Sequence, residues 1–288
     1  MVRLGIAMTL AAVLSVAAPA QAAPTDPRLQ GVESWAFAIG SHTLDGDPPA
    51  VGARYAPFDL IVVDGEEARA DEIAAIRADG TIVLGYLSVG TIESYRGWYR
   101  KAKRFRLEAW KDWQDEWYAD VNRAGLRRLL SQRIAPSLLD KGFDGLFLDN
   151  TDMIEGHRSR TQGMHKLVDS LGSLSDARGT LLFAQNGAAT IGPMLANFDG
   201  WNREDVSWTY DFDHKRYEPT GKGSIAEAQE ELRAISASGL LVTATDYTAD
   251  GDMPAEVGSI SNACAASALP YVSDIGLRRV PTQPLLCP

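Results

Sequence analysis

The stretch that decides the fold is Asp140-Lys141-Gly142, followed by Phe-Asp-Gly-Leu-Phe-Leu-Asp at 143–149. A helical segment ends here, a glycine suits the left-handed C-cap of that helix, and a β-rich apolar run begins at once. The same arrangement occurs at three more places, at Gly80, Gly179 and Gly239. Repeated units of helix, glycine and apolar run predict an α/β fold whose strands are parallel.

Eight apolar runs fit this series, which predicts a (β/α)8 barrel, a fold of about 250 residues. The alternative is an open doubly wound sheet, usually marked by a glycine-rich phosphate loop after the first strand. No GxGxxG or Walker sequence occurs. Ser224 and Glu227 have the spacing of a capping box and predict that a helix opens there. The expected strands are 34–39, 58–64, 81–87, 143–149, 180–186, 198–204, 240–246 and 269–275.

Residues 1–22 have the pattern of a secretory signal peptide. Arg3 precedes the apolar run 4–18, and Ala20-Gln21-Ala22 supplies a small-residue cleavage site. The alternative, a membrane anchor, needs roughly 20 apolar residues. We therefore expect a secreted or periplasmic protein whose mature part, 23–288, is a single barrel domain without a membrane span.

The chain is acidic, with 28 Lys and Arg residues against 38 Asp and Glu, a formal charge of −10. Removal of 1–22 takes away Arg3 and no acid, which leaves 27 − 38 = −11. Nucleic acid is a poor partner for such a chain, because neutralising phosphates requires a basic face. A cationic partner would suit it, although acidity also simply aids solubility.

Cys264 and Cys287 are the two cysteines of the chain. In an exported protein such a pair is more often a disulfide than a reactive site, and the alternative is two unpaired buried thiols. The four histidines show no HExxH spacing, and no CxxC occurs. We expect neither a metal site nor a cofactor.

The connection from Gly90 to Gly142 is long enough for a helix and an additional excursion, so we expect an insertion between the third and fourth strands. It is rich in aromatic residues and carries a basic run at 100–104. Its rings could form a small core of their own, or a wall that stacks against sugars or attracts cations. We expect one or two of them to face the active site.

Carboxylates gather at the predicted carboxyl ends of the strands, where (β/α)8 enzymes carry their active sites. Paired carboxylates without metal ligands point to glycoside hydrolysis, in which one acid protonates the leaving oxygen. The other stabilises or attacks the oxocarbenium-like centre. A strand-end aspartate can instead cap a helix or hold a loop. The strand ends supply Asp64, Ser88, Asp149, Asn186, Glu204, Asp246 with Tyr247, and Asp274, and Asp152 follows just past the fourth strand.

The segments VLGYLSVGTIESYRGWY (83–99) and GFDGLFLDNTD (142–152) resemble glycoside hydrolase family 114, the endo-α-1,4-polygalactosaminidases. The similarity extends over nearly the whole mature chain, but the first strand and the Asn202-Arg203-Glu204 segment depart from the usual pattern. The resemblance implies a metal-free (β/α)8 barrel in which Asp149 and Glu204 are catalytic. It places in the sugar subsite Asp64, Tyr86, Ser88, Asn186, Asp246 and Tyr247, beside which Asp152 is a further candidate for substrate binding.

The sequence thus leads to one hypothesis, an exported enzyme that cleaves α-1,4-linked galactosamine-containing exopolysaccharide by two-carboxylate acid catalysis. Its expected partner is a cationic, galactosamine-rich polymer. Two alternatives stay open. One is a carbohydrate-binding barrel without catalysis, and the other is a glycosidase of a different α-linked sugar, such as an α-galactoside.

Overall fold

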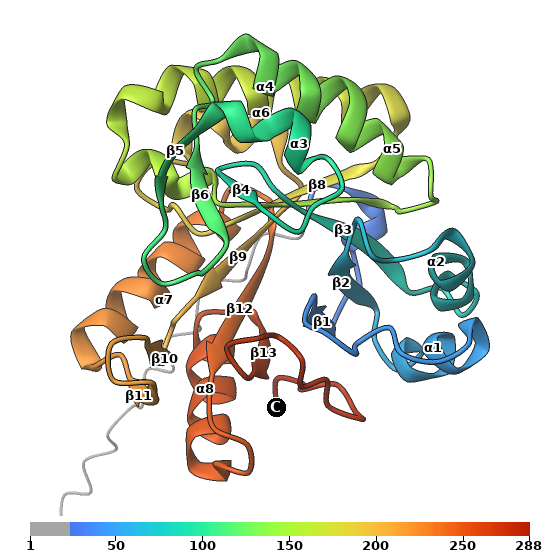
Figure 1. Cartoon of the computed structure of the whole chain (residues 1–288). Coiled ribbons are helices and arrows are strands. Elements are labelled where there is room, and N and C mark those ends of the chain that lie inside the picture. The colour runs from blue at the N-terminus through green and yellow to red at the C-terminus, as the bar shows by residue number, and fades with distance from the viewer. Residues whose placement is uncertain (1–23) are drawn as a thin grey trace, which may run out of the picture.

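The computed structural model describes residues 24–288, and the predicted signal peptide, residues 1–22, lies outside them. Eight parallel strands form a nearly closed barrel with helices on its outside (Figure 1), which confirms the predicted (β/α)8 fold. The strands follow one another around the barrel in chain order. They are β1 (Trp35–Ala38), β2 (Leu60–Asp64), β3 (Ile82–Ser88), β7 (Gly145–Asp149), β8 (Leu181–Gln185), β9 (Gly200–Glu204), β12 (Leu241–Tyr247) and β13 (Leu269–Ser273).

The four glycines that follow the helical segments have the backbone conformation that the sequence predicts. Gly80, Gly142, Gly179 and Gly239 have φ values of 95°, 104°, 62° and 84°. A side chain at these positions would be strained in the left-handed region, whereas glycine enters it at little cost. Gly179 is itself the C-cap of its helix, whereas the other three glycines lie two residues past the C-cap, and each turns the chain toward the next strand.

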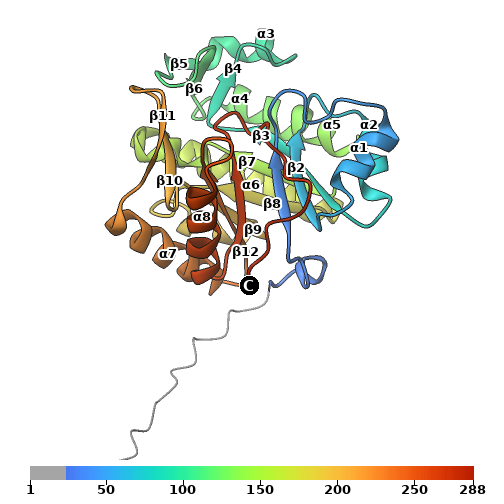
Figure 2. The same cartoon turned by 90° about the horizontal axis from the view of Figure 1, so that it is seen from below.

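Helices surround the strands (Figure 2), although the connection between β8 and β9 contains only the 3₁₀ helix Gly192–Asn197. The predicted helix start at Ser224 is wrong, because α7 begins at Lys222 after Gly221, whose φ is 91°. Within residues 24–288, no helix has the length and apolar character needed to cross a membrane. The α-helices are α1 (Pro48–Tyr55), α2 (Ala70–Arg77), α3 (Tyr99–Ala102), α4 (Ala124–Leu129), α5 (Ala135–Leu139), α6 (Thr161–Arg178), α7 (Lys222–Ser236) and α8 (Met253–Ala265).

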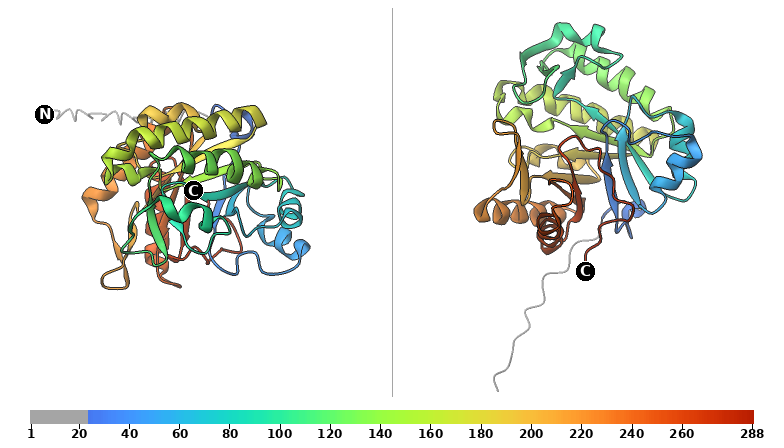
Figure 3. Two further views of the ribbon diagram at one scale, coloured as in Figure 1. Left: turned by 45° about the horizontal axis from the view of Figure 1, so that its top comes forward. Right: turned by 60° about the horizontal axis from the view of Figure 1, so that its bottom comes forward.

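Two excursions leave the barrel at the carboxyl ends of its strands. The predicted insertion between β3 and β7 contains α3 and a three-stranded antiparallel sheet. A second excursion between β9 and α7 is a β-hairpin that the sequence did not reveal. The two lie close to each other in Figures 2 and 3. Their strands are β4 (Thr91–Glu93), β5 (Arg106–Ala109) and β6 (Glu116–Ala119) in the insertion, and β10 (Trp208–Asp211) and β11 (Arg216–Pro219) in the hairpin.

Aromatic side chains fill the barrel beneath the site. The ring of Phe37 lies 4.9 Å from that of Phe147, 6.3 Å from that of Tyr86 and 6.0 Å from that of Trp35, measured between centroids. These four residues come from β1, β3 and β7, and all are buried. Close packing of this kind gives the strand ends a rigid base.

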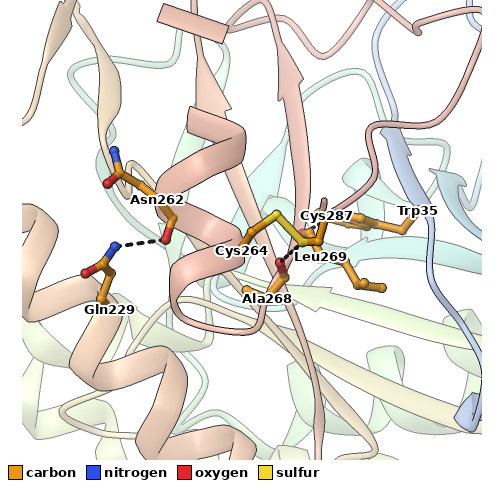
Figure 4. The surroundings of a disulfide bond; sticks show 7 residues. All are labelled: Trp35, Gln229, Asn262, Cys264, Ala268, Leu269 and Cys287. Carbon is orange, nitrogen blue, oxygen red and sulfur yellow. Dashed lines mark hydrogen bonds between the residues drawn. A yellow bond between two sulfur atoms is a disulfide. The ribbon is translucent and has the colours of Figure 1, made fainter. Parts of the chain in front are cut away.

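The barrel closes between β1 and β13, the two ends of the strand order. Trp35 Nε1 donates a hydrogen bond of 2.9 Å to the carbonyl oxygen of Leu269, and at the other end of this seam Gly40 N donates to Leu277 O at 3.0 Å. Cys264 in α8 and Cys287 form a disulfide, as the sequence predicts, with their Cα atoms 5.4 Å apart. Figure 4 shows it beside Leu269 and Trp35, so it holds the C-terminal segment against the seam.

Candidate active site

The carboxyl ends of the strands surround a cavity of about 500 Å³. All eight strands are parallel, so their ends meet at the same side of the barrel. Side chains of the insertion and of the hairpin complete the walls. The predicted site residues that line this cavity are Asp64, Tyr86, Asp149, Asp152, Asn186, Glu204 and Tyr247.

Asp149, at the end of β7, is held by three donors. It accepts hydrogen bonds from the Tyr86 hydroxyl at 2.5 Å, from Gln185 Nε2 at 3.0 Å and from the backbone N–H of Asn150 at 2.7 Å. Burial raises the pKa of this carboxyl, while the hydrogen bonds counteract the rise because they favour the ionised form.

Glu204, at the end of β9, is the second carboxyl of the site, and like Asp149 it is half-buried. Asn186 Nδ2 donates to it at 2.7 Å, and the Tyr247 hydroxyl donates to its other oxygen. Burial raises its pKa, and the negative charges of Asp149 and Asp205 raise it further. The pKa of Glu204 consequently lies above that of Asp149, so the arrangement favours an ionised aspartate beside a protonated glutamate.

The chain turns sharply directly after these strands. Asn150, Asn186 and Asp205 follow β7, β8 and β9, and their φ values are 61°, 56° and 56°. Asn and Asp tolerate this left-handed conformation better than other residues with a side chain. The turn after β8 also brings the Asn186 side chain to Glu204, because its Oδ1 accepts from the Glu204 backbone N–H at 3.0 Å.

A buried layer of amides and hydroxyls supports Asp149 from inside the barrel. Gln185, which binds Asp149, accepts a hydrogen bond from Asn202 Nδ2 at 3.1 Å. Asn202 Oδ1 in turn accepts from the hydroxyls of Thr243 at 3.0 Å and Thr245 at 3.1 Å. A buried hydrogen-bond network of this kind restricts the rotamers of its members, and here it fixes the amide that faces Asp149.

Arg96 of the insertion joins two buried acids. Its guanidinium donates to Asp64 at 2.6 Å and to Glu93 at 2.6 Å. All three residues are buried. Asp64 is thus charge-paired, and the contact fastens the insertion to the end of β2.

Three further acids line the cavity, and each has a raised pKa, so that its ionised form is disfavoured. Burial raises the pKa of Glu116 on β6 to about 8, that of Asp152 to about 7 and that of Asp205 to about 6. The charges of Glu93 and Asp149 add to the effect at Glu116, and those of Asp149 and Glu155 add to it at Asp152. This crowding of acids would be relieved by a bound cation.

The rings of the aromatic insertion divide between the hydrophobic core and the cavity. Trp98 and Phe105 are buried, whereas Tyr95, Trp110 and Trp113 line the cavity. Phe212, in the turn of the hairpin, also lines the cavity.

A bridge connects the insertion to the hairpin. The rings of Trp113 and Phe212 meet edge to face with centroids 5.4 Å apart. Beside them, Lys111 Nζ lies 2.7 Å from Asp213. The insertion follows β3 and the hairpin follows β9, so the bridge passes the β7 and β8 side of the site, where Asp149 and Asn186 lie.

Three strand-end residues of the prediction do not line the cavity. Ser88 is buried against Thr91 and Asn150. Asp246 accepts from the backbone N–H and the hydroxyl of Ser207, and so holds the loop after β9. Asp274 accepts from Arg278 and from the backbone of the following loop. Ser88 and Asp246 were expected to contact the sugar directly. In the structure their side chains bind neighbouring loop residues instead.

Several cavity residues were missed at the sequence level. Glu93, Arg96 and Glu116 lie in the insertion, where no strand-end argument applies. Gln185 could have been predicted, because it lies two residues after Phe183 on β8 and therefore on the same face of the strand. Arg203 precedes Glu204 in the sequence, and its guanidinium pairs with Glu231 of α7 at 2.9 Å rather than with the Glu204 carboxyl.

Within the described residues, no group of three or more His, Cys, Asp and Glu side chains is arranged to hold a metal ion. The expectation of a site without metal or cofactor stays a prediction. A pair of carboxyls with separated pKa values, at the carboxyl ends of the strands of a (β/α)8 barrel, is typical of glycoside hydrolases.

The chain belongs to glycoside-hydrolase family GH114, whose family model matches residues 15–280. An uncharacterized protein of Deinococcus radiodurans is 26% identical over 281 residues, which cover 88% of this chain and 84% of the relative. Among solved structures, a variant of the glycoside hydrolase domain of PelA from Pseudomonas aeruginosa matches with a TM-score of 0.73 and 18% identity, over 86% of this chain and 96% of that one. Aspergillus fumigatus Ega3, in complex with galactosamine, matches with a TM-score of 0.65 and 17% identity, over 91% and 96%.

Proposed function

We propose that the protein is an exported hydrolase that cleaves α-1,4-linked galactosamine-containing exopolysaccharide. The observation that carries the proposal is the pair of half-buried carboxyls, Asp149 and Glu204, in one acid-lined cavity. Membership of family GH114 supports the reaction class.

In this mechanism Glu204 is the general acid. Because its pKa is raised, it retains a proton near neutral pH and can transfer it to the glycosidic oxygen as the bond to the anomeric carbon breaks. Asp149 faces the positive charge that develops on the sugar ring, as nucleophile or as charge stabiliser. Water then supplies a hydroxyl group to the anomeric carbon and a proton that restores the acid.

The neighbouring side chains position these two groups. Tyr86 and Gln185 hold the Asp149 carboxylate, and Asn186 and Tyr247 hold Glu204. Each catalytic carboxyl therefore has a side chain on either oxygen, which limits its rotation before substrate arrives.

The cavity suits an amino sugar. Asp152, Glu116 and Asp205 offer carboxyl groups to an ammonium. The lining includes Arg96, but Asp64 and Glu93 already neutralise its charge. Trp110 and Trp113 provide faces for the sugar rings. That the related Ega3 was solved with galactosamine supports the same substrate class for this chain.

Export is the second part of the proposal. The disulfide between Cys264 and Cys287 is of a kind that forms and persists in oxidising compartments. Together with the signal-peptide pattern of residues 1–22, it supports a secreted or periplasmic location.

The test is the release of reducing ends from partly deacetylated galactosaminogalactan. Wild-type protein should release them, and Asp149→Asn and Glu204→Gln should each lower the rate by at least about a hundredfold. Glu230→Gln is the matched control, because Glu230 is exposed on α7 and lies outside the cavity; it should leave the rate unchanged.

Three results would contradict the proposal. Saturable binding without any bond cleavage would favour a carbohydrate-binding barrel. Faster cleavage of a neutral α-galactoside than of the galactosamine polymer would assign a different substrate. Full activity in both carboxyl variants would remove Asp149 and Glu204 from the mechanism.

A further inference from the structure

A basic groove of about 400 Å³ lies on the insertion and the helix that follows it, and it shares no lining residue with the active-site cavity. Lys101, Arg104, Arg128 and Arg133 line it, and no Asp or Glu is part of its lining. Such a lining is unusual for a chain whose formal charge is −10. A general need for solubility does not explain why these positive charges cluster at one groove.

The cations of the groove have no carboxylate partners among the described residues. Several arginines elsewhere have such a partner, for example Arg77 with Asp144 at 2.7 Å and Arg203 with Glu231 at 2.9 Å. Arg104 instead lies 4.8 Å from the ring centroid of Phe105. Four cations that face one hollow repel one another, and an anion between them would relieve that repulsion.

The helical segment that carries Arg128 and Arg133 departs from regular α-helical geometry. Between α4 and α5 the residues Leu130–Ile134 form a π-helical turn. Such turns are rare, bond residue i to i+5, and often occur at functional sites. In a regular α-helix, residues five apart face different directions, whereas the wider turn brings Arg128 and Arg133 to the same groove.

We propose that this groove is a binding site for an anionic group of the phosphate or sulfate class, carried by a small molecule or by a lipid headgroup. Guanidinium groups match the paired oxygens of such anions, and the volume suits a small ligand. Buried Phe105 and Leu129 offer the ligand an apolar floor. An extended polyanion such as nucleic acid fits less well, because the acidic remainder of the chain would repel it.

Isothermal titration with pyrophosphate tests the site in the full-length mature protein. The double variant Arg128→Ala/Arg133→Ala should bind about tenfold or more weakly than wild type. Arg158→Ala/Lys166→Ala is the matched control, since it removes the same charge from two exposed residues outside the groove; its affinity should stay within about twofold of wild type. Lys101→Ala/Arg104→Ala provides a second groove variant on a different element, with the same expected loss.

Vesicles distinguish the source of the anion. Groove-dependent binding to phosphatidylglycerol vesicles, but not to phosphatidylcholine vesicles, would assign a lipid headgroup; pyrophosphate binding without vesicle binding would assign a soluble ligand. The proposal is overturned if pyrophosphate shows no saturable binding, if the control pair loses as much affinity as the groove variants, or if a DNA duplex binds through the groove more tightly than pyrophosphate. Polysaccharide cleavage should be unchanged in the groove variants, so either proposal can fail alone.

Discussion

Two tyrosine hydroxyls meet the two central carboxyls, Tyr86 at Asp149 and Tyr247 at Glu204. Burial, and the adjacent acids, raise the pKa values of both tyrosines well above their ordinary value. Each phenol therefore keeps its proton and acts as a donor. A donor stabilises the ionised form of a carboxyl, so these tyrosines oppose the rise in carboxyl pKa that burial causes.

Tyr86→Phe should shift the acidic limb of the pH–activity profile upward by about one pH unit. Loss of the hydroxyl leaves Asp149 with two donors, so its pKa rises and it becomes ionised only at higher pH. The measurement is kcat/KM on a soluble galactosamine oligomer across pH 4–9. Tyr55→Phe is the control, because Tyr55 is buried but donates to Thr43, outside the cavity. An acidic limb that stays in place would show that Tyr86 does not tune Asp149.

Glu204→Gln should make the protein more stable at pH 8, by ~2 kcal/mol, and equally stable near pH 4. The folded-state pKa of Glu204 is raised, so the folded protein holds this proton more tightly than the unfolded chain does. Stability contributed by the protonated group is present below the unfolded pKa and is lost as pH rises toward the folded pKa. Gln carries no such proton. Denaturant unfolding at both pH values measures the difference, and a constant gap between variant and wild type would contradict it.

Side-chain alternation explains both a success and a failure of the sequence reasoning. Thr243, Thr245 and Tyr247 share one face of β12, and all three reach residues of β9 inside the barrel. Asp246 has the opposite parity and faces Ser207. The position at a strand end alone cannot distinguish Asp246 from Tyr247. The parity of each residue along the strand does, because it tells which of them faces the barrel interior.

At the scale of elements, the insertion depends on its buried charges for its position. Asp64 at the end of β2 and Glu93 on β4 both contact Arg96. The sequence predicted where the insertion occurs from its length, and four units of helix, glycine and apolar run, together with four further apolar runs, predicted the eight strands. It could not predict these contacts or the hairpin bridge, because they depend on how two long connections pack in space rather than on any local pattern.

Arg96→Met should destabilise the protein by about 3–5 kcal/mol, because two buried carboxylates are left without a counterion. Thermal unfolding and limited proteolysis of the insertion measure the effect. Arg216→Met is the comparison, since the pair of Arg216 with Glu218 is exposed on the hairpin and should contribute little. Equal stability of the two variants would contradict the role of the buried cluster.

Replacement of both cysteines, Cys264→Ser with Cys287→Ser, should lower the free energy of unfolding by about 3 kcal/mol. The bond closes a loop of 23 residues that includes β13 and holds the C-terminal segment at the seam. Comparison of oxidised wild type, reduced wild type and the double variant by denaturant unfolding separates loss of the bond from loss of the sulfur atoms. A reduced wild type as stable as the oxidised protein would contradict the prediction.

At the scale of the whole molecule, the charge is divided between two regions. The active-site cavity collects acids, whereas Lys101, Arg104, Arg128 and Arg133 form the basic groove. An overall charge of −10 therefore understates how acidic the surroundings of the cavity are. Composition alone predicted a cationic partner but could not indicate that one region has the opposite preference.

The cleavage of a cationic polymer should slow as salt is added. Raising NaCl from 20 to 200 mM should lower kcat/KM on a long, deacetylated polymer by about tenfold, because screening weakens the long-range attraction between opposite charges. A short, fully acetylated oligomer is the control and should show little change. Equal salt dependence of both substrates would argue against electrostatic attraction of the polymer.

The seam between β1 and β13 also bears on how the protein is made. Its contact between Trp35 and Leu269 joins residues 234 positions apart. During synthesis β1 leaves the ribosome long before its neighbour exists, so the two-sided burial of this first strand has to wait for almost the entire chain. Contacts of such high sequence separation form slowly, and the apolar strand is exposed to aggregation meanwhile. A chaperone that keeps the chain extended until synthesis ends would therefore benefit this barrel more than a fold assembled from successive neighbours alone.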